Sequence, residues 1–131
     1  MQFNKNTIIL LLLLFVVLRG GGGSSAPFPA DKLSVLIVES TEARSSMPAM
    51  QTAARDSTVW RAYVDGKQGQ WRVLDDQTNI DKEADWVKSG MAVKRDSLPW
   101  VVVSDGKRGS SEPLPPDLDS LLAKIKETGG Q

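Results

Sequence analysis

The sequence predicts an α/β domain with the element order β-α-β-α-β-β-α, in which one mixed four-stranded sheet carries helices on both faces. Two nearly continuous apolar runs rich in β-branched residues, 33–38 and 98–104, are typical of strands buried on both faces. Apolar residues recur at helical spacing between and after these runs. An Asp-Gly pair directly after the second run favours a hairpin that closes the sheet.

An apolar segment precedes this domain. Residues 8–18 are eleven apolar residues in succession, with Lys5 before them and Arg19 after them. The run has the length of the hydrophobic region of a signal peptide. As a helix it would span about 16 Å, roughly half of the hydrocarbon core of a membrane. We therefore predict a signal peptide or membrane anchor over residues 1–19.

A Gly/Ser/Pro linker is predicted over residues 20–31, followed by the domain over 32–128. The small residues up to Ala26 suit signal-peptide cleavage, whereas Pro27 does not, so a released and a tethered protein both remain open. Either alternative predicts a location outside the cytoplasm. The protein is periplasmic or secreted if the leader is removed. If the leader is retained, the protein is membrane-anchored and contacts the membrane through its apolar run.

The first predicted strand leads into a segment with helical spacing, residues 42–66. Pro48 is tolerated only near the first turn of a helix, so the regular helix is expected to begin near residue 45 or 46. Asp56 and Ser57 form a capping signal, which predicts either one helix kinked there or two short helices in series. The apolar stripe of the first part consists of Met47, Met50, Ala53 and Ala54.

The alternating run 70–75 predicts a second strand with every other residue facing the core. Asn79 is a capping residue for the next helical pattern, whose apolar stripe extends over 80–91. Gly90 interrupts this pattern and is a candidate for its end.

The third predicted strand, 98–104, is followed by Asp105 and Gly106, which predict a hairpin turn. A second arm is expected over 109–114, before two consecutive prolines end it. The last helix has acidic residues in its first turn and lysines near its end, as the helix dipole favours. Its apolar stripe consists of Leu118, Leu121, Leu122 and Ile125.

The composition excludes several functions. The chain contains no Cys and no His, which excludes thiol–disulfide chemistry and lipid attachment to cysteine, and removes the usual ligands of zinc and haem. After Ala26 there are 14 basic and 16 acidic residues, a net charge of 14 − 16 = −2. Such a domain has no electrostatic reason to bind nucleic acid. We expect no cofactor and no metal.

The order of the elements resembles that of thioredoxin. The first strand, LSVLIV, runs directly into a turn and a helix, as the thioredoxin strand does before its Cys-x-x-Cys motif. Residues 73–77 look like the second strand and the loop after it. Ser97-Leu98-Pro99, with the strand and turn that follow, is similar to the family's cis-proline loop and closing hairpin. The resemblance covers about residues 32–128 and implies a thioredoxin-like fold.

The resemblance places the redox pair of the family at about residues 42–45, where this sequence has Glu-Ala-Arg-Ser. Serine cannot form the mixed disulfide that thiol exchange requires, so the family's oxidoreductase activity does not transfer. The family also binds extended peptides beside its cis-proline, which needs only backbone geometry. The resemblance therefore implies a protein or peptide partner at the edge formed by Leu98 and Pro99, near Glu42 and Ser45. The alternative is that Pro99 only shapes its loop.

Trp86 is a separate candidate for partner contact, because it lies off the apolar stripe of its helix. Other chemistry finds little support. The acidic run 75–81 lacks the Gly and Glu that a calcium-binding EF-hand loop requires, and no residue is assigned a catalytic role. We thus predict a redox-inactive, non-catalytic binding or structural module. Two alternatives stay open: an enzyme that uses carboxylate or serine groups, and a membrane accessory protein that acts through residues 8–18.

Overall fold

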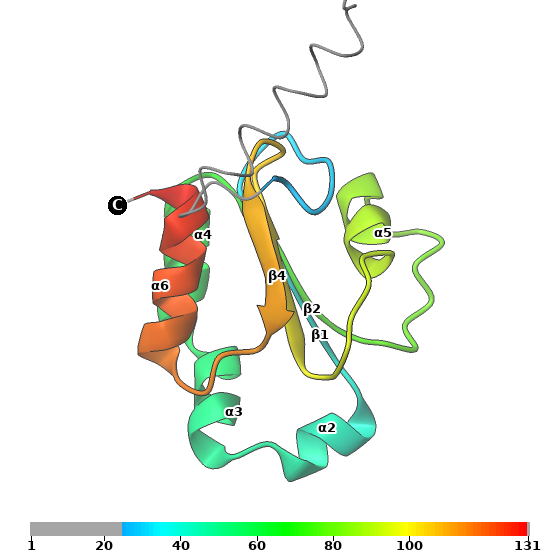
Figure 1. Ribbon diagram of the computed structural model, residues 1–131, viewed down its shortest axis with the longest axis vertical. Helices are drawn as coiled ribbons and strands as arrows, with labels where there is room; N and C mark the ends of the chain where they lie inside the picture. The colour runs from blue at the N-terminus through cyan, green and yellow to red at the C-terminus, as the bar shows by residue number, and fades with distance from the viewer. Residues whose placement is uncertain (1–24, 131) are drawn as a thin grey trace, which may run out of the picture.

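The computed structural model describes residues 25–130; the predicted export segment and the start of the linker lie outside them. The described chain forms one mixed sheet with the strand order β2-β1-β3-β4 and helices packed against it (Figure 1). This confirms the predicted fold class and element order, and the strand order is compatible with a thioredoxin-like arrangement. The strands are β1 (Ser34–Glu39), β2 (Gln70–Asp75), β3 (Trp100–Ser104) and β4 (Gly109–Pro113). The helices are α2 (Thr41–Ser46), α3 (Ala49–Asp56), α4 (Thr58–Gly66), α5 (Asp85–Met91) and α6 (Leu118–Gly129).

Strand β1 is fully buried and organises the sheet. It pairs in parallel with β2 and antiparallel with β3, whose apolar residues are equally buried. In the second pairing Val38 lies opposite Trp100. The carboxyl end of β1, from which α2 begins, therefore lies at the same end of the sheet as Pro99.

Alternate residues of the central strands face two different cores. On one face Val35, Ile37 and Val103 pack with buried residues of α3, α4 and α6, among them the completely buried Trp60. On the other face Leu36 and Val38 pack against Val87 of α5. Figure 1 shows α4 and α6 on one side of the sheet and α5 on the other. The prediction of helices on both faces is thus confirmed.

The helices that connect β1 to β2 have different boundaries from those predicted. The connection contains three short helices: α2 already begins at Thr41, and α3 begins after Pro48, which occupies its N-cap position without a side-chain hydrogen bond. The expected start near residue 45 or 46 was wrong because Ser40 caps α2, accepting a hydrogen bond at 3.0 Å from the Ala43 backbone. Ser57 caps α4 as predicted. The expected apolar stripe buries Ala54 only, whereas Met50 is 66% exposed.

Helix α5 is shorter than its sequence pattern predicts. It begins at Asp85, and Asn79 instead accepts a hydrogen bond from the Asp81 backbone in a turn. The preceding residues do not join the helix because Glu83 forms an ion pair with Arg72 on β2, which holds this loop in a different path. Gly90 does not end the helix. It lies inside it, where an added Cβ would be 2.8 Å from Leu36 on the sheet.

The segment before β1 packs on the domain. Phe28 is 3% exposed, and its carbonyl accepts a hydrogen bond at 2.7 Å from the hydroxyl of Ser104. Gly106 in the β3–β4 turn has φ +89°, and a Cβ there would lie 1.9 Å from the Ala30 carbonyl oxygen. Only glycine permits both this backbone conformation and this close approach. The hairpin turn between β3 and β4 therefore packs closely against residues 25–32.

Candidate functional site

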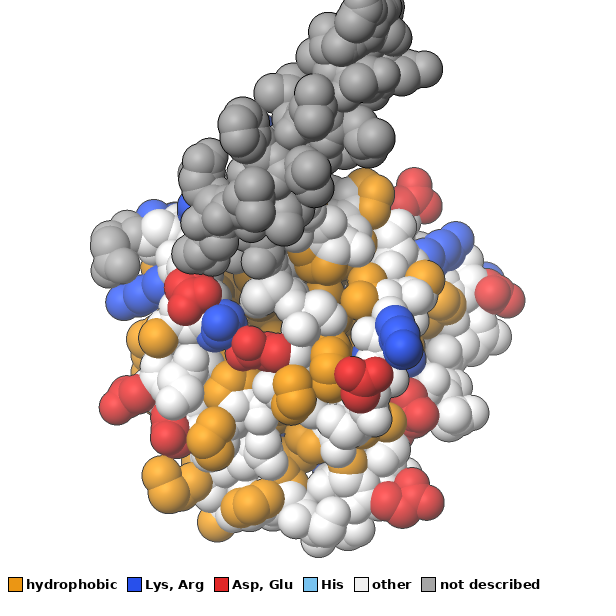
Figure 2. Space-filling view, in the orientation of Figure 1, with side chains coloured by type: hydrophobic (Ala, Val, Ile, Leu, Met, Phe, Trp, Pro, Cys, Tyr) orange, Lys and Arg blue, Asp and Glu red, His pale blue; other side chains and the backbone are white. Residues whose placement is uncertain are grey.

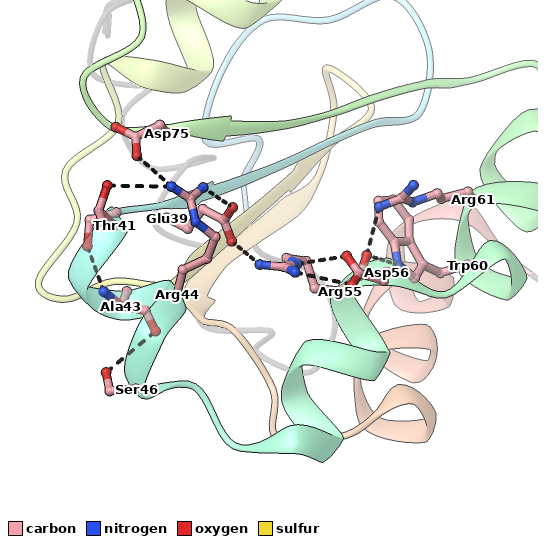
Figure 3. Close-up of polar contacts among 11 residues, drawn as sticks. Glu39, Thr41, Ala43, Arg44, Ser46, Arg55, Asp56, Trp60, Arg61 and Asp75 are labelled. Atoms are coloured by element: carbon pink, nitrogen blue, oxygen red, sulfur yellow. Dashed lines mark hydrogen bonds and ion pairs between the residues drawn. The ribbon is translucent and has the colours of Figure 1, made fainter.

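A buried carboxylate stands at the end of β1, beside the place where the resemblance puts a redox pair. Glu39 is 5% exposed. Its two oxygens accept hydrogen bonds from Arg44 at 2.9 Å and from Arg55 at 2.8 Å (Figure 3). Arg44 also lies 3.6 Å from the carboxylate of Asp75 at the end of β2. The two arginines come from α2 and α3, so this cluster ties both helices to the ends of the two parallel strands.

Arg55 is the most heavily paired member of this cluster. Its Nε and Nη2 donate to the two oxygens of Asp56, at 2.9 Å and 3.1 Å. These hydrogen bonds raise the pKa of Arg55 against the opposing effect of burial, and Glu39 raises it further. The hydrogen bond from Arg55 likewise lowers the pKa of Asp56. The pairing of Arg55 with Asp56 thus favours the charged forms of these two side chains.

The chemistry available to this cluster is limited. A carboxylate that accepts bonds from two guanidinium groups has its basic oxygens occupied, and so is poorly suited to take a proton from a substrate. Breaking such a pair leaves a buried charge uncompensated, so the cluster orders α2 and α3. We interpret the Glu39–Arg44–Arg55 cluster as a structural element that joins α2 and α3 to the end of β1.

Glu42 and Ser45 both lie on α2 and are exposed. The hydroxyl of Ser45 donates to the Glu42 carbonyl oxygen at 3.0 Å, and that of Ser46 donates to the same oxygen at 2.9 Å. These local bonds satisfy the end of a short helix. The carboxylate of Glu42 has no hydrogen-bond or ion-pair partner among residues 25–130 and faces solvent.

Leu98 and Pro99 form the loop that enters β3, and the peptide bond between them is cis. The Leu114 backbone donates to the Pro99 carbonyl at 3.0 Å. The side chain of Gln51 on α3 in turn donates to the Leu114 carbonyl at 2.7 Å. The proline loop, the end of β4 and α3 are therefore joined by consecutive hydrogen bonds at one end of the sheet.

Two surface features accompany this end of the molecule. Leu98 lines an open depression of about 390 Å³ together with Asp76, Arg95 and Asp96. Met50, the neighbour of Gln51 on α3, exposes most of its side chain. In Figure 2 hydrophobic side chains gather at the lower end of the molecule, over α3 and the neighbouring end of α6.

Trp86 is not part of this end. It is partly buried on α5, stacks with Phe28 at a ring separation of 6.1 Å, and lines a different depression. Trp86 and Leu98 nevertheless pack on the same two core clusters. The other tryptophans are largely core residues: Trp60 and Trp100 are buried, and Trp71 packs against Trp60 at the edge of the larger core.

Sequence reasoning gave Glu39 and Arg55 no functional role, and it did not expect Met50 at the surface. The signal for Glu39 was present, because a carboxylate closes an otherwise apolar strand and must be paired if buried. Its partners could not be chosen from a chain with 16 basic residues. Met50 was expected in the core because helical spacing alone does not show which side of a short helix faces the sheet.

Comparisons with models of known protein families, with curated proteins and with solved structures find no match to this chain. Among residues 25–130 there is no group of acidic side chains able to hold a metal ion. Over the same residues, no helix has the length and apolar character needed to cross a membrane. The site is therefore characterised by its geometry.

Proposed function

We propose that this chain is a redox-inactive, thioredoxin-like binding module, exported or tethered outside the cytoplasmic membrane, that holds an extended peptide segment beside Leu98 and Pro99. The observation that carries the proposal is the hydrogen-bonded series from Pro99 through Leu114 to Gln51. It fixes the proline loop beside α3, whose Met50 is the most exposed large apolar side chain among residues 25–130.

The chemistry of this end favours binding over catalysis. Glu39 is paired with two arginines, and the hydroxyls of Ser45 and Ser46 donate to a local carbonyl. An exposed methionine adapts to different apolar partners because its side chain is unbranched and flexible. The depression next to Leu98 offers room for a neighbouring side chain of the bound segment.

Peptide selection tests the binding role. A random peptide library is displayed on phage and selected on the purified domain, and the affinity of a selected peptide is measured by fluorescence polarisation. We expect Met50→Lys and Leu98→Lys each to weaken that peptide by about tenfold or more, because both place a charge in an apolar contact.

Val59→Lys is the matched control. Val59 is 49% exposed on α4, outside the proline loop and α3, so its substitution should leave affinity unchanged. Circular dichroism verifies that all variants are folded. Selected peptides that bind Met50→Lys and Leu98→Lys as tightly as the original protein, or a selection that enriches none, would refute the binding site.

The export part of the proposal rests on residues 8–18 and has its own test. Expression of the full chain in a bacterium is followed by fractionation, with and without an alkaline carbonate wash. Protein that stays in the membrane pellet after the wash is tethered, and protein in the periplasmic or culture fraction is released. Recovery in the cytoplasmic fraction would overturn this part alone.

A further inference from the structure

A second depression, away from Pro99, lies between the segment before β1 and the start of α5. Its volume is about 530 Å³. Asp31, Lys32, Gln70, Asp85 and Trp86 line it, and we call it the Trp86 pocket. In Figure 1 the N-terminal segment drawn in blue and α5 lie beside each other at this end of the sheet.

The polar groups of the Trp86 pocket are mainly hydrogen-bond acceptors. Neither Asp31 nor Asp85 has an ion-pair or hydrogen-bond partner for its carboxylate among residues 25–130. Gln70 donates its amide to Ser34 at 2.8 Å, and Ser34 donates to the Lys32 carbonyl at 2.9 Å. The side-chain carbonyl of Gln70 accepts nothing within the same residues. Among the lining residues that the structure describes, Lys32 is the only cation, and with Asp31 and Asp85 they carry a net negative charge.

Trp86 differs from the other tryptophans of the chain in its hydrogen bonding. The indole N–H groups of Trp60, Trp71 and Trp100 each donate to an acceptor within the domain. That of Trp86 has no acceptor among residues 25–130. The ring stacks with Phe28 at an interplanar angle of 26° and also lines the pocket, so an aromatic surface adjoins the carboxylates.

Elsewhere in the domain, aromatic rings contact the guanidinium group of an arginine. On the other face of the sheet the guanidinium of Arg61 lies 4.5 Å from the centre of the Trp71 ring and 5.2 Å from that of Trp60. Aromatic rings attract cations through the negative potential of their faces, and nearby carboxylates add to the attraction. The Trp86 pocket has the aromatic ring and the carboxylates, and none of the domain's arginines lines it.

We propose that the Trp86 pocket binds a guanidinium or alkylammonium group. Asp31 and Asp85 provide the charge, the Gln70 carbonyl accepts a hydrogen bond, and the Trp86 ring contacts the cation. The group is either a basic side chain of a polypeptide or a small free organic cation. This site does not depend on the peptide-binding role proposed above, because its lining shares no residue with the depression at Leu98.

Nuclear magnetic resonance tests the proposal directly. The indole N–H signal of Trp86, assigned by its loss in Trp86→Phe, is followed while capped arginine is added to the full-length protein. We expect a saturable shift, and no saturable shift with capped citrulline, which has nearly the same shape without the charge. Asp31→Asn and Asp85→Asn should each weaken binding about threefold to fivefold.

Asp81→Asn is the matched control, because Asp81 is an exposed carboxylate in the loop before α5 that does not line the pocket. Titration with spermidine and with a glycine-flanked arginine peptide distinguishes the two sources, since the tighter ligand shows whether a free cation or a side chain is preferred. Equal shifts with arginine and citrulline, or equal losses in Asp81→Asn and Asp85→Asn, would overturn the proposal. So would the absence of a saturable shift.

Discussion

The two faces of the sheet are covered in different ways. One face carries α3, α4 and α6, and its cluster includes completely buried residues from each of these helices: Ala54, Trp60, Val64, Leu121 and Ile125. The other carries the single seven-residue helix α5, with Phe28 from the segment before β1 completing its cover. The first face is closed by regular helices, whereas the second is closed partly by irregular chain.

The N-terminal ends of the helices also differ between the two faces. Asp117 caps α6 by accepting a hydrogen bond at 2.8 Å from the Ser120 backbone. Helix α5 has Ala84 at the same position, where no side chain can accept such a bond. Both depressions described above are lined mainly by segments that cover the second face, namely the stretch before β1, α5 and the loop before β3, together with Gln70 and Asp76 from the two ends of β2. The larger buried core thus lies on one face, and the segments that cover the other face supply most of the lining of both depressions.

The largest expected effect is on the α3–α4–α6 face. Trp60→Ala should lower the free energy of unfolding by about 5 kcal/mol, because it removes a completely buried ring and a hydrogen bond to the Ala54 carbonyl. Urea denaturation measures the loss. Trp86→Ala provides the comparison on the other face and should cost less than half as much, because Trp86 is partly exposed. Equal losses would mean that the two faces are equally stabilised.

The sheet was largely predictable from the sequence, since its signals are local. The runs 33–38 and 98–104 and the alternation at 70–75 gave three strands to within about two residues at their ends. The start of α5 was not predictable, because the pairing of Glu83 with Arg72 joins the loop to β2. The Glu39 cluster was missed for a related reason, since its partners lie five and sixteen positions away and only the fold brings them together.

Phe28→Ala should lower the free energy of unfolding by about 3 kcal/mol. This is the lower end of the range for a buried aromatic side chain, because the depression beside α5 lets neighbouring side chains relax into the space. Urea denaturation gives the total, and hydrogen exchange shows whether the amides of β1 and α5 are exposed together. An unchanged unfolding midpoint would show that residues 25–32 do not stabilise the domain.

Glu39→Ala should cost about 2 to 3 kcal/mol, because Arg55 loses a partner while 13% exposed. The loss stays below that of a fully buried pair because the side chain of Arg44 is 42% exposed and can turn to water. Glu39→Gln keeps one accepting oxygen, whereas its amide nitrogen can only donate and leaves the other arginine without an acceptor, so most of the loss should remain, as measured by thermal and urea denaturation. A stabilised Glu39→Ala would contradict the role given to the cluster.

Ala84→Ser should add about 1 kcal/mol by providing α5 with the cap that it lacks, since Ala84 already has the extended backbone of a capping residue. The gain should appear in the urea midpoint and in slower exchange of amides in the first turn of α5. Ala92→Ser, at the exposed opposite end of the same helix, is the matched control and should bring no such gain. Equal changes in the two variants would indicate a general surface effect.

The smallest effect is expected at the cap of α6 and depends on pH. The hydrogen bond from the Ser120 backbone lowers the pKa of Asp117 below its ordinary value of about 4. Because the folded pKa is the lower one, this carboxylate stabilises the fold above the unfolded pKa, and the contribution disappears as the pH falls through the folded pKa. Asp117→Asn should therefore be less stable than the original protein at pH 7 and converge with it at acidic pH.

Urea midpoints at neutral and acidic pH measure this convergence. Both proteins share every other titrating group, so the contributions of those groups cancel in the difference between the two midpoints. Asp119→Asn is the control, since Asp119 is an exposed acid in the same first turn that does not cap the helix. If the gap between Asp117→Asn and the original protein stays constant from neutral to acidic pH, the carboxylate does not act through its charge. The charged cap of α6 would then stabilise the helix no more than a neutral cap does. The difference between α6 and α5 would depend only on whether the N-cap side chain has a hydrogen-bond acceptor.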